Sequence, residues 1–142
     1  MIKISRAWAA VALVMGTTVA FGEIYSIPHE QIDQKKVYWG VPTGFEKPGE
    51  IDYDAIVQAT PEYKELKKKK IERGTGKYWI LMSQASDRTA RAIAQVGQDT
   101  EYDLIAAQGY LSGLNPPIPA EDITNLIVDQ LEDNPAKSVS KK

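Results

Sequence analysis

Helix-breaking residues divide this chain and so limit where regular structure can form. Six glycines and prolines fall between residues 23 and 50, a density that disfavours a regular helix there. We therefore predict an irregular N-terminal arm at residues 23–49, lying on the rest of the protein with Trp39 and Phe45 as anchors. A short strand at residues 37–41 is the alternative for part of this arm.

Two helices are predicted in the middle of the chain. The first begins at the pair Thr60-Pro61, a capping residue followed by proline at the first helical position, and continues to Arg73. The second covers residues 78–96, where apolar side chains recur every three or four residues, and ends at Gly97. A Gly-Thr-Gly breaker joins the two into a short hairpin, whose first arm of about 12 residues is ~18 Å long.

The last third of the chain predicts a strand followed by a helix. Residues 102–107 form an apolar strand, and residues 51–53 are the possible end of another. Asp122 caps a helix from Ile123 to about Leu131, and the polar residues 133–142 form a disordered tail. The expected fold class is α+β: a small β-rich oligomerisation body with a short helical hairpin and a C-terminal helix.

Residues 1–22 have the three-part pattern of a cleavable secretory signal peptide. Lys3 and Arg6 precede an apolar run of about 14 residues. Ala20 and Gly22, on either side of Phe21, are small residues at the two positions that a signal peptidase recognises. A membrane anchor or a buried helix is the alternative, but a spanning helix needs roughly 20 apolar residues. We therefore predict export, with cleavage between Gly22 and Glu23.

Charge and cysteine content exclude several classes of function. The chain has a net charge of −2, and losing Lys3 and Arg6 would leave 15 basic against 19 acidic residues, a net charge of −4. An acidic chain is a poor partner for nucleic acid, because phosphate binding requires a basic surface. The chain has no cysteine, which excludes disulfides, thiolate catalysis and attachment of lipid to cysteine.

No group of residues has the pattern of an active site. His29 is the only histidine, and no motif surrounds it, so an enzyme built on His29 is the least favoured class. Asp52 with Asp54, or Glu121 with Asp122, could hold a hard cation, but a strand-to-helix turn and a helix cap explain these pairs more simply. We predict a non-enzymatic protein without metal or cofactor.

Two features near the hairpin turn suggest a contact surface. Lysines occupy positions 67–70, near the predicted C-terminal end of a helix, where positive charge is favourable. The favoured interpretation is a solvated helix face, and the alternative is a contact patch for anionic lipid, lipopolysaccharide or an acidic client. After the turn, residues 78–82 are five large apolar side chains in succession. Such a helix is apolar on both sides, which predicts contact with another subunit as well as with its own core.

The order of short motifs resembles the Skp/OmpH family of periplasmic chaperones. Residues 92–96 match an "A-I-x-x-V" helix end, residues 102–105 a "Y-D-L-I" strand, and residues 122–124 a "D-I-T" helix start. Residues 53–64 are similar to the family's first strand and helix start, so the resemblance covers about residues 50–132. It implies a periplasmic homotrimer whose hairpin arms hold unfolded outer-membrane proteins, and it carries over no catalytic residues.

The resemblance also implies roles for particular residues. By position, the arm runs from Tyr63 to about Ser86, and the oligomer body includes Leu104, Ile105, Ile123 and Ile127. We predict that lysines at the rim shape the surface (Lys67, Lys68, Lys69 and Lys70) and that clients contact four apolar residues (Tyr78, Trp79, Leu81 and Met82).

The chain also departs from the family pattern. Its arm is only about three turns long, its charge is acidic where the family is basic, and residues 23–49 are additional. The alternative function is therefore a structural subunit or adaptor of a larger envelope assembly, with the same patch as a permanent interface. Contact with a membrane, if any, is expected to be peripheral.

Overall fold

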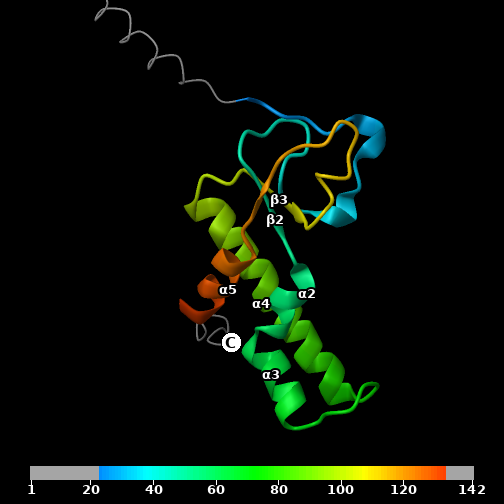
Figure 1. The fold of residues 1–142 in the computed structure, drawn as a ribbon. Helices are drawn as coiled ribbons and strands as arrows, with labels where there is room; N and C mark the ends of the chain where they lie inside the picture. Colours follow the sequence, from blue (N-terminus) through cyan, green and yellow to red (C-terminus); the bar gives the residue numbers. More distant parts are fainter. Residues whose placement is uncertain (1–22, 134–142) are drawn as a thin grey trace, which may run out of the picture.

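The computed structural model describes residues 23–133, which form an α+β fold built on a four-stranded mixed sheet (Figure 1). The predicted α+β class, with a helical hairpin and a C-terminal helix, is therefore confirmed, whereas the role of the sheet in oligomerisation stays a prediction. The predicted signal peptide and all but one residue of the predicted tail lie outside the described residues. Within residues 23–133, no helix has both the length and the apolar character that crossing a bilayer requires.

The strands are short and come from distant parts of the chain. Their order in the sheet is β1-β3-β2-β4, with β3 antiparallel to β1 and parallel to β2, and with β4 parallel to β2. In chain order the elements are two 3-10 helices, η3 (His29–Gln31) and η4 (Gln34–Lys36), then β1 (Val37–Gly40), β2 (Pro48–Ile51), α2 (Tyr53–Gln58), α3 (Pro61–Lys68), α4 (Gly76–Asp99), β3 (Leu104–Ala107), β4 (Glu121–Asp122) and α5 (Thr124–Asp133).

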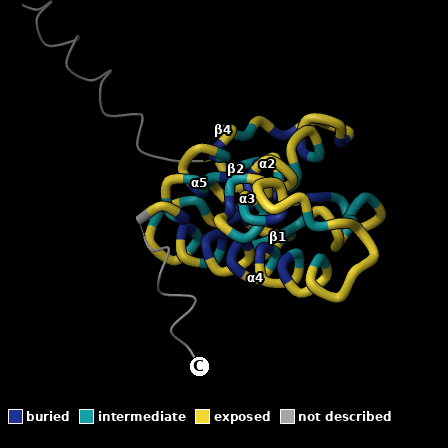
Figure 2. The backbone as a smooth tube through the Cα atoms, turned by 90° about the horizontal axis from the view of Figure 1, so that it is seen from below, coloured by how far each residue is buried: buried dark blue, intermediate teal, exposed yellow. Residues whose placement is uncertain are grey.

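A hydrophobic cluster lies on each face of the sheet, because successive side chains of β3 point to opposite faces. Ile105 belongs to the cluster that α2, α4 and α5 cover. Leu104 and Ala106 belong to the second cluster, which is completed by the N-terminal segment and by the loop after β3. Buried and exposed stretches alternate along α4, as expected of a helix with one face on a core (Figure 2).

The N-terminal segment is part of the domain rather than an irregular arm throughout. Residues 37–40 form β1, which confirms the alternative of a short strand there, and the irregular arm is also wrong for residues 48–49, which begin β2. Phe45 is 1% exposed, as expected of an anchor, and its backbone pairs with that of Tyr25. Gly40 has φ +94° and lies against the backbone of Asp103, where a Cβ atom would overlap the carbonyl oxygen, so only glycine fits at this end of β1.

Both helices of the hairpin end at other residues than predicted, each for a physical reason. The first helix ends at Lys68 rather than at Arg73, because the chain turns there into a left-handed residue. The second begins at Gly76, two residues before the predicted start, and continues through Gly97 to Asp99. Gly97 is not a C-terminal cap but a contact point, since a Cβ atom there would overlap the indole ring of Trp39.

The predicted capping residues lie where the helices begin. Thr60 Oγ1 accepts the backbone N–H of Tyr63 at the start of α3, at 3.2 Å. Asp122 Oδ1 accepts the backbone N–H of Thr124 at 3.0 Å, so α5 begins at Thr124, one residue later than predicted. The predicted strand at residues 102–107 is shorter, since β3 begins at Leu104.

Candidate functional site

The base of the helical hairpin is fixed by a buried ion pair between its two helices. Arg88 on α4 donates from Nε to Glu62 Oε1 of α3 at 2.9 Å, and from an Nη atom to Glu62 Oε2 at 2.7 Å. The two side chains are 6% and 13% exposed. A two-pronged contact of this kind holds the helices in one relative position, so the far end of the hairpin rests on a rigid base.

The far end of the hairpin, which we call the hairpin tip, comprises residues 67–80. It extends away from the sheet (Figure 1) and carries six basic residues and one acidic residue, a net charge of +5 in a chain of net charge −2. All of these charged residues are exposed, namely Lys67, Lys68, Lys69, Lys70, Arg73, Lys77 and Glu72. The tip is therefore a basic surface on an acidic protein.

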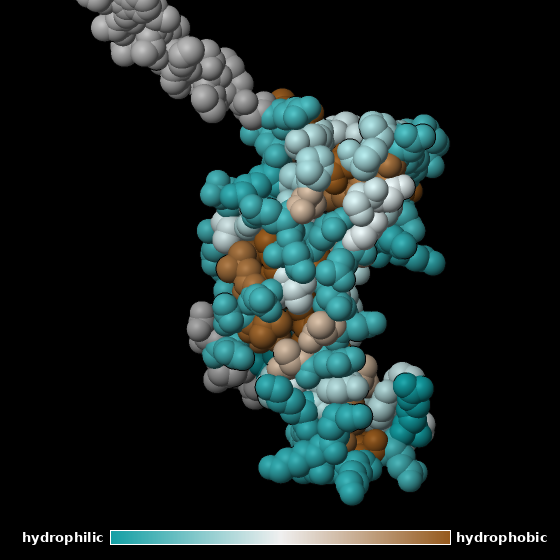
Figure 3. Space-filling model, viewed as in Figure 1, coloured by the Kyte–Doolittle hydropathy of each residue, from teal (hydrophilic) through white to brown (hydrophobic). Residues whose placement is uncertain are grey.

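The hairpin tip also exposes apolar side chains. Trp79 is 61% exposed, and Ile80, which is not among the predicted client-binding residues, is 59% exposed. Half-buried Tyr78 packs edge-to-face on Trp79, with ring centroids 5.2 Å apart. In Figure 3 a small hydrophobic area lies among hydrophilic side chains at this end of the molecule.

The four predicted client-binding residues do not form one surface. Trp79 is exposed, Tyr78 and Met82 are half-buried, and Leu81 is only 7% exposed. Leu81 is therefore not available to a client. Ile80 takes its place as the second exposed apolar side chain of the tip.

The predicted rim lysines have different surroundings. Lys69 pairs with Glu65 one turn earlier, at 3.0 Å, and the Nζ of Lys67 lies 5.9 Å from the ring centroid of Tyr63. Lys70 has φ +51°, in the left-handed region. The backbone N–H groups of Lys70 and Ile71 donate to the carbonyls of Lys67 and Leu66, which is the pattern of a Schellman motif with Lys70 at the position that favours glycine.

We therefore expect Lys70→Gly to stabilise the protein. Glycine adopts this backbone conformation without the steric cost that a Cβ atom brings, so the free energy of unfolding should rise by about 0.5–1 kcal/mol. The thermal midpoint should rise by about 3 °C. The matched control is Lys64→Gly, at an exposed position in the middle of α3, which should lower stability instead. A lower midpoint for Lys70→Gly would contradict the left-handed turn.

The predicted oligomer body lies in the interior of one chain. Leu104 and Ile105 are 0% exposed, Ile127 is 0% exposed and Ile123 is 4% exposed. They divide between the two hydrophobic clusters on opposite faces of the sheet. Any contact between copies of the chain must therefore use other residues.

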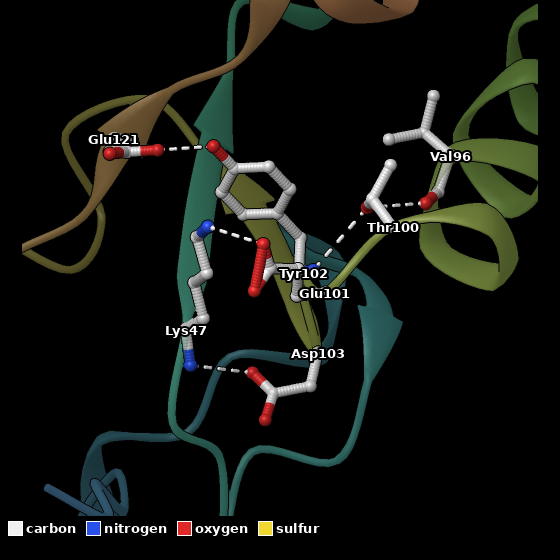
Figure 4. A network of polar contacts seen from close by, with 7 residues as sticks. All are labelled: Lys47, Val96, Thr100, Glu101, Tyr102, Asp103 and Glu121. Carbon is white, nitrogen blue, oxygen red and sulfur yellow. Dashed lines mark hydrogen bonds and ion pairs between the residues drawn. The ribbon is translucent and has the colours of Figure 1, made fainter. Parts of the chain in front are cut away.

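A polar network ties the start of β3 to its neighbours (Figure 4). The Tyr102 hydroxyl donates to Glu121, and this hydrogen bond, followed by burial and by the charges of Glu121 and Glu101, raises the pKa of Tyr102 to about 12. The Nζ of Lys47 lies 3.3 Å from Glu101 and 4.7 Å from the centroid of the Tyr102 ring. Because Tyr102 keeps its proton, this network is suited to holding β4 in place rather than to proton transfer.

The remaining candidate residues do not converge on a centre for chemistry. Asp122 accepts hydrogen bonds from Thr124 and Gln108, and these lower its pKa despite burial, which acts in the opposite direction. His29 is exposed on η3. Among residues 23–133, no three histidine, aspartate or glutamate side chains lie close enough together to hold a metal ion.

Comparison with known proteins finds no matching family, no matching curated protein and no matching solved structure. The resemblance to the Skp/OmpH family, and everything that it implies, therefore stays a prediction. What the site itself offers is a rigid helical hairpin that presents an exposed apolar pair within a basic surface.

Proposed function

We propose that this protein is an exported, non-enzymatic protein that binds other polypeptide chains, as a Skp/OmpH-like periplasmic chaperone does, with the hairpin tip as its contact surface. The observation that carries the proposal is the pair Trp79 and Ile80. Among the described residues, five large hydrophobic side chains are exposed, and only these two are adjacent in sequence. They belong to the hairpin tip, which extends away from the sheet (Figure 1).

The chemistry of the tip suits reversible binding of unfolded chains. Trp79 and Ile80 offer apolar area that a client's apolar side chains can bury, and an indole ring is a frequent anchor of protein interfaces. The surrounding basic side chains attract acidic residues and speed encounter, but exposed charges add little affinity. A patch this small gives weak contacts, which a client can leave.

The short length of the hairpin favours binding of one client by several copies of the protein together. The eight residues of α3 are about 12 Å long, at 1.5 Å per residue, which is too short for one hairpin to surround a client. Several tips on one assembly would raise the effective concentration of binding sites. This supports the proposed homotrimer.

The test is suppression of aggregation of a denatured outer-membrane β-barrel protein, followed by light scattering. Trp79→Ala should raise the concentration needed for half-suppression about fivefold, the effect of losing about 1 kcal/mol of binding free energy. The matched control is Val41→Ala, which truncates an equally exposed apolar side chain near the sheet. If Trp79→Ala behaves like Val41→Ala, the hairpin tip is not the client surface.

The second candidate is a subunit or adaptor of an envelope assembly. The same exposed pair favours it, because a permanent partner would cover Trp79 and Ile80. The native mass of the purified protein distinguishes the two candidates. A self-contained homotrimer supports the chaperone, whereas a chain that always co-purifies with one partner supports the adaptor.

A further inference from the structure

A β-bulge brings a tyrosine of β1 to the helix-covered face of the sheet. Val37 pairs with Ala106 and Trp39 pairs with Ile105, so Tyr38 is an extra residue in β1. Such a bulge turns the side chain of the extra residue. As a result Tyr38 and Trp39, although adjacent, both pack against the hydrophobic cluster beneath the helices.

Tyr38 stacks on Tyr53, the first residue of α2. The ring centroids are 5.1 Å apart and the ring planes are inclined by 25°. The two rings line a recess of about 300 Å³, whose other lining residues are Ile51, Asp52, Asp54, Ala107 and Gln108. They also line a smaller recess of about 200 Å³ against Ala90 and Ile93 of α4. We call the larger recess the tyrosine pocket.

The tyrosine pocket is negatively charged. Asp52 uses one carboxylate oxygen to cap α2, through the backbone N–H of Ala55 at 3.2 Å. No hydrogen bond or ion pair among residues 23–133 engages the carboxylate of Asp54. Burial, followed by the electrostatic interactions of Tyr53, Asp54 and Asp52, raises the pKa of the Tyr38 phenol.

We propose that the tyrosine pocket binds a guanidinium group. A guanidinium plane stacks on the face of a tyrosine ring, and its N–H groups donate to carboxylates in the same plane. The pocket supplies both, with two tyrosine rings and the carboxylates of Asp52 and Asp54. A recess of about 300 Å³ holds the group together with part of the chain that carries it.

The pocket is independent of the hairpin tip. It lies at the carboxyl ends of the parallel strands β2 and β3, which finish at Ile51 and Ala107. The hairpin tip includes the start of α4 and lies away from the sheet (Figure 1). The guanidinium site can therefore be tested separately from the proposed client surface.

The test follows the tyrosine ring signals by NMR while N-acetyl-argininamide is added. Saturable shifts of Tyr38 and Tyr53 are expected. The matched ligand is N-acetyl-citrullinamide, which has nearly the same shape without the charge, and it should give no saturable shift. No saturation with the arginine compound, or equal shifts with both compounds, would overturn the proposal.

Two variants locate the binding. Asp54→Asn should weaken binding of N-acetyl-argininamide about two- to fivefold, the effect expected of one exposed charge pair. Asp129→Asn removes an exposed carboxylate from α5 and should leave binding unchanged. If the two variants bind equally well, the pocket is not the site.

A capped Gly-Gly-Arg-Gly-Gly peptide distinguishes two sources of the guanidinium. Tighter binding of the peptide than of N-acetyl-argininamide supports the arginine of a polypeptide segment, because backbone contacts then contribute. Equal binding supports recognition of the guanidinium group alone, as in a small free ligand. Binding of neither compound refutes the site.

Discussion

Replacing Phe45 with alanine is expected to lower the free energy of unfolding by about 3–4 kcal/mol. Phe45 is 1% exposed and belongs to the hydrophobic cluster on the second face of the sheet, with Leu104 and Leu111. Removing the ring takes apolar area out of the core and leaves a cavity that this short, turn-rich segment cannot close. Urea unfolding followed by circular dichroism measures the loss.

The control for Phe45→Ala lies four residues earlier in the same segment. Val41 is 61% exposed, so Val41→Ala should change stability by less than about 0.5 kcal/mol. Because domains of this size are stable by roughly 5–15 kcal/mol, the two outcomes are easily separated. Equally small effects would mean that residues 23–49 are an appended arm after all, with no share in the core.

The helices α3, α4 and α5 were predictable because their signals are local, whereas α2 was missed, since Tyr53 begins this helix and does not end a strand. Thr60 and Asp122 accept hydrogen bonds from backbone N–H groups two or three residues later, which a short stretch of sequence can reveal. Gly97 was misread because its role is not local. It accommodates Trp39 from a distant strand, and nothing near position 97 in the sequence indicates that contact.

The strands were harder to predict, because their pairing joins distant parts of the chain. Residues 37–40 contain glycine and lie among turn formers, yet they pair with β3 more than 60 residues later. The carboxylate of Glu50 accepts the backbone N–H groups of Gly109 and Leu111 and so holds the loop after β3. Such contacts exist only once the fold has formed.

The candidate site was predictable in location but not in orientation. The Gly-Thr-Gly breaker and the apolar run after it predict a hairpin end with apolar residues. Which of these residues face outward depends on where α3 packs, because adjacent residues of a helix point about 100° apart. Leu81 is therefore buried and Ile80 exposed. The stacking of Tyr38 on Tyr53 depends on a bulge, for which the sequence gives no signal.

Replacing Glu62 with alanine is expected to lower the free energy of unfolding by about 3 kcal/mol. The change removes the carboxylate that pairs with the Arg88 guanidinium. Arg88 is only 5% exposed, so its guanidinium cannot reach water unless the hairpin opens. Breaking a buried pair costs far more than breaking an exposed one, because the remaining charge keeps its desolvation penalty. Chemical unfolding of the purified variant measures the effect.

The control for Glu62→Ala is on the same helix. Glu65 pairs with Lys69, but these side chains are 38% and 56% exposed. Glu65→Ala should therefore cost no more than about 0.5 kcal/mol. Similar losses for the two variants would show that the Arg88 pair is not what fixes α3 on α4.

The Glu62 pair also predicts how stability depends on pH. Burial acts to raise the pKa of Glu62, but the hydrogen bonds from Arg88, then a backbone hydrogen bond and the positive charges of Arg88 and Arg91, outweigh it and lower the pKa below 4.5. A lowered folded pKa means that the stabilisation is complete above pH 4.5 and is lost as the pH falls through the folded value. Glu62→Gln has no carboxylate to titrate, so the stability difference between the natural protein and this variant should shrink as the pH is lowered below 4.5. A difference that stays constant with pH would mean that the ionised carboxylate does not stabilise the hairpin.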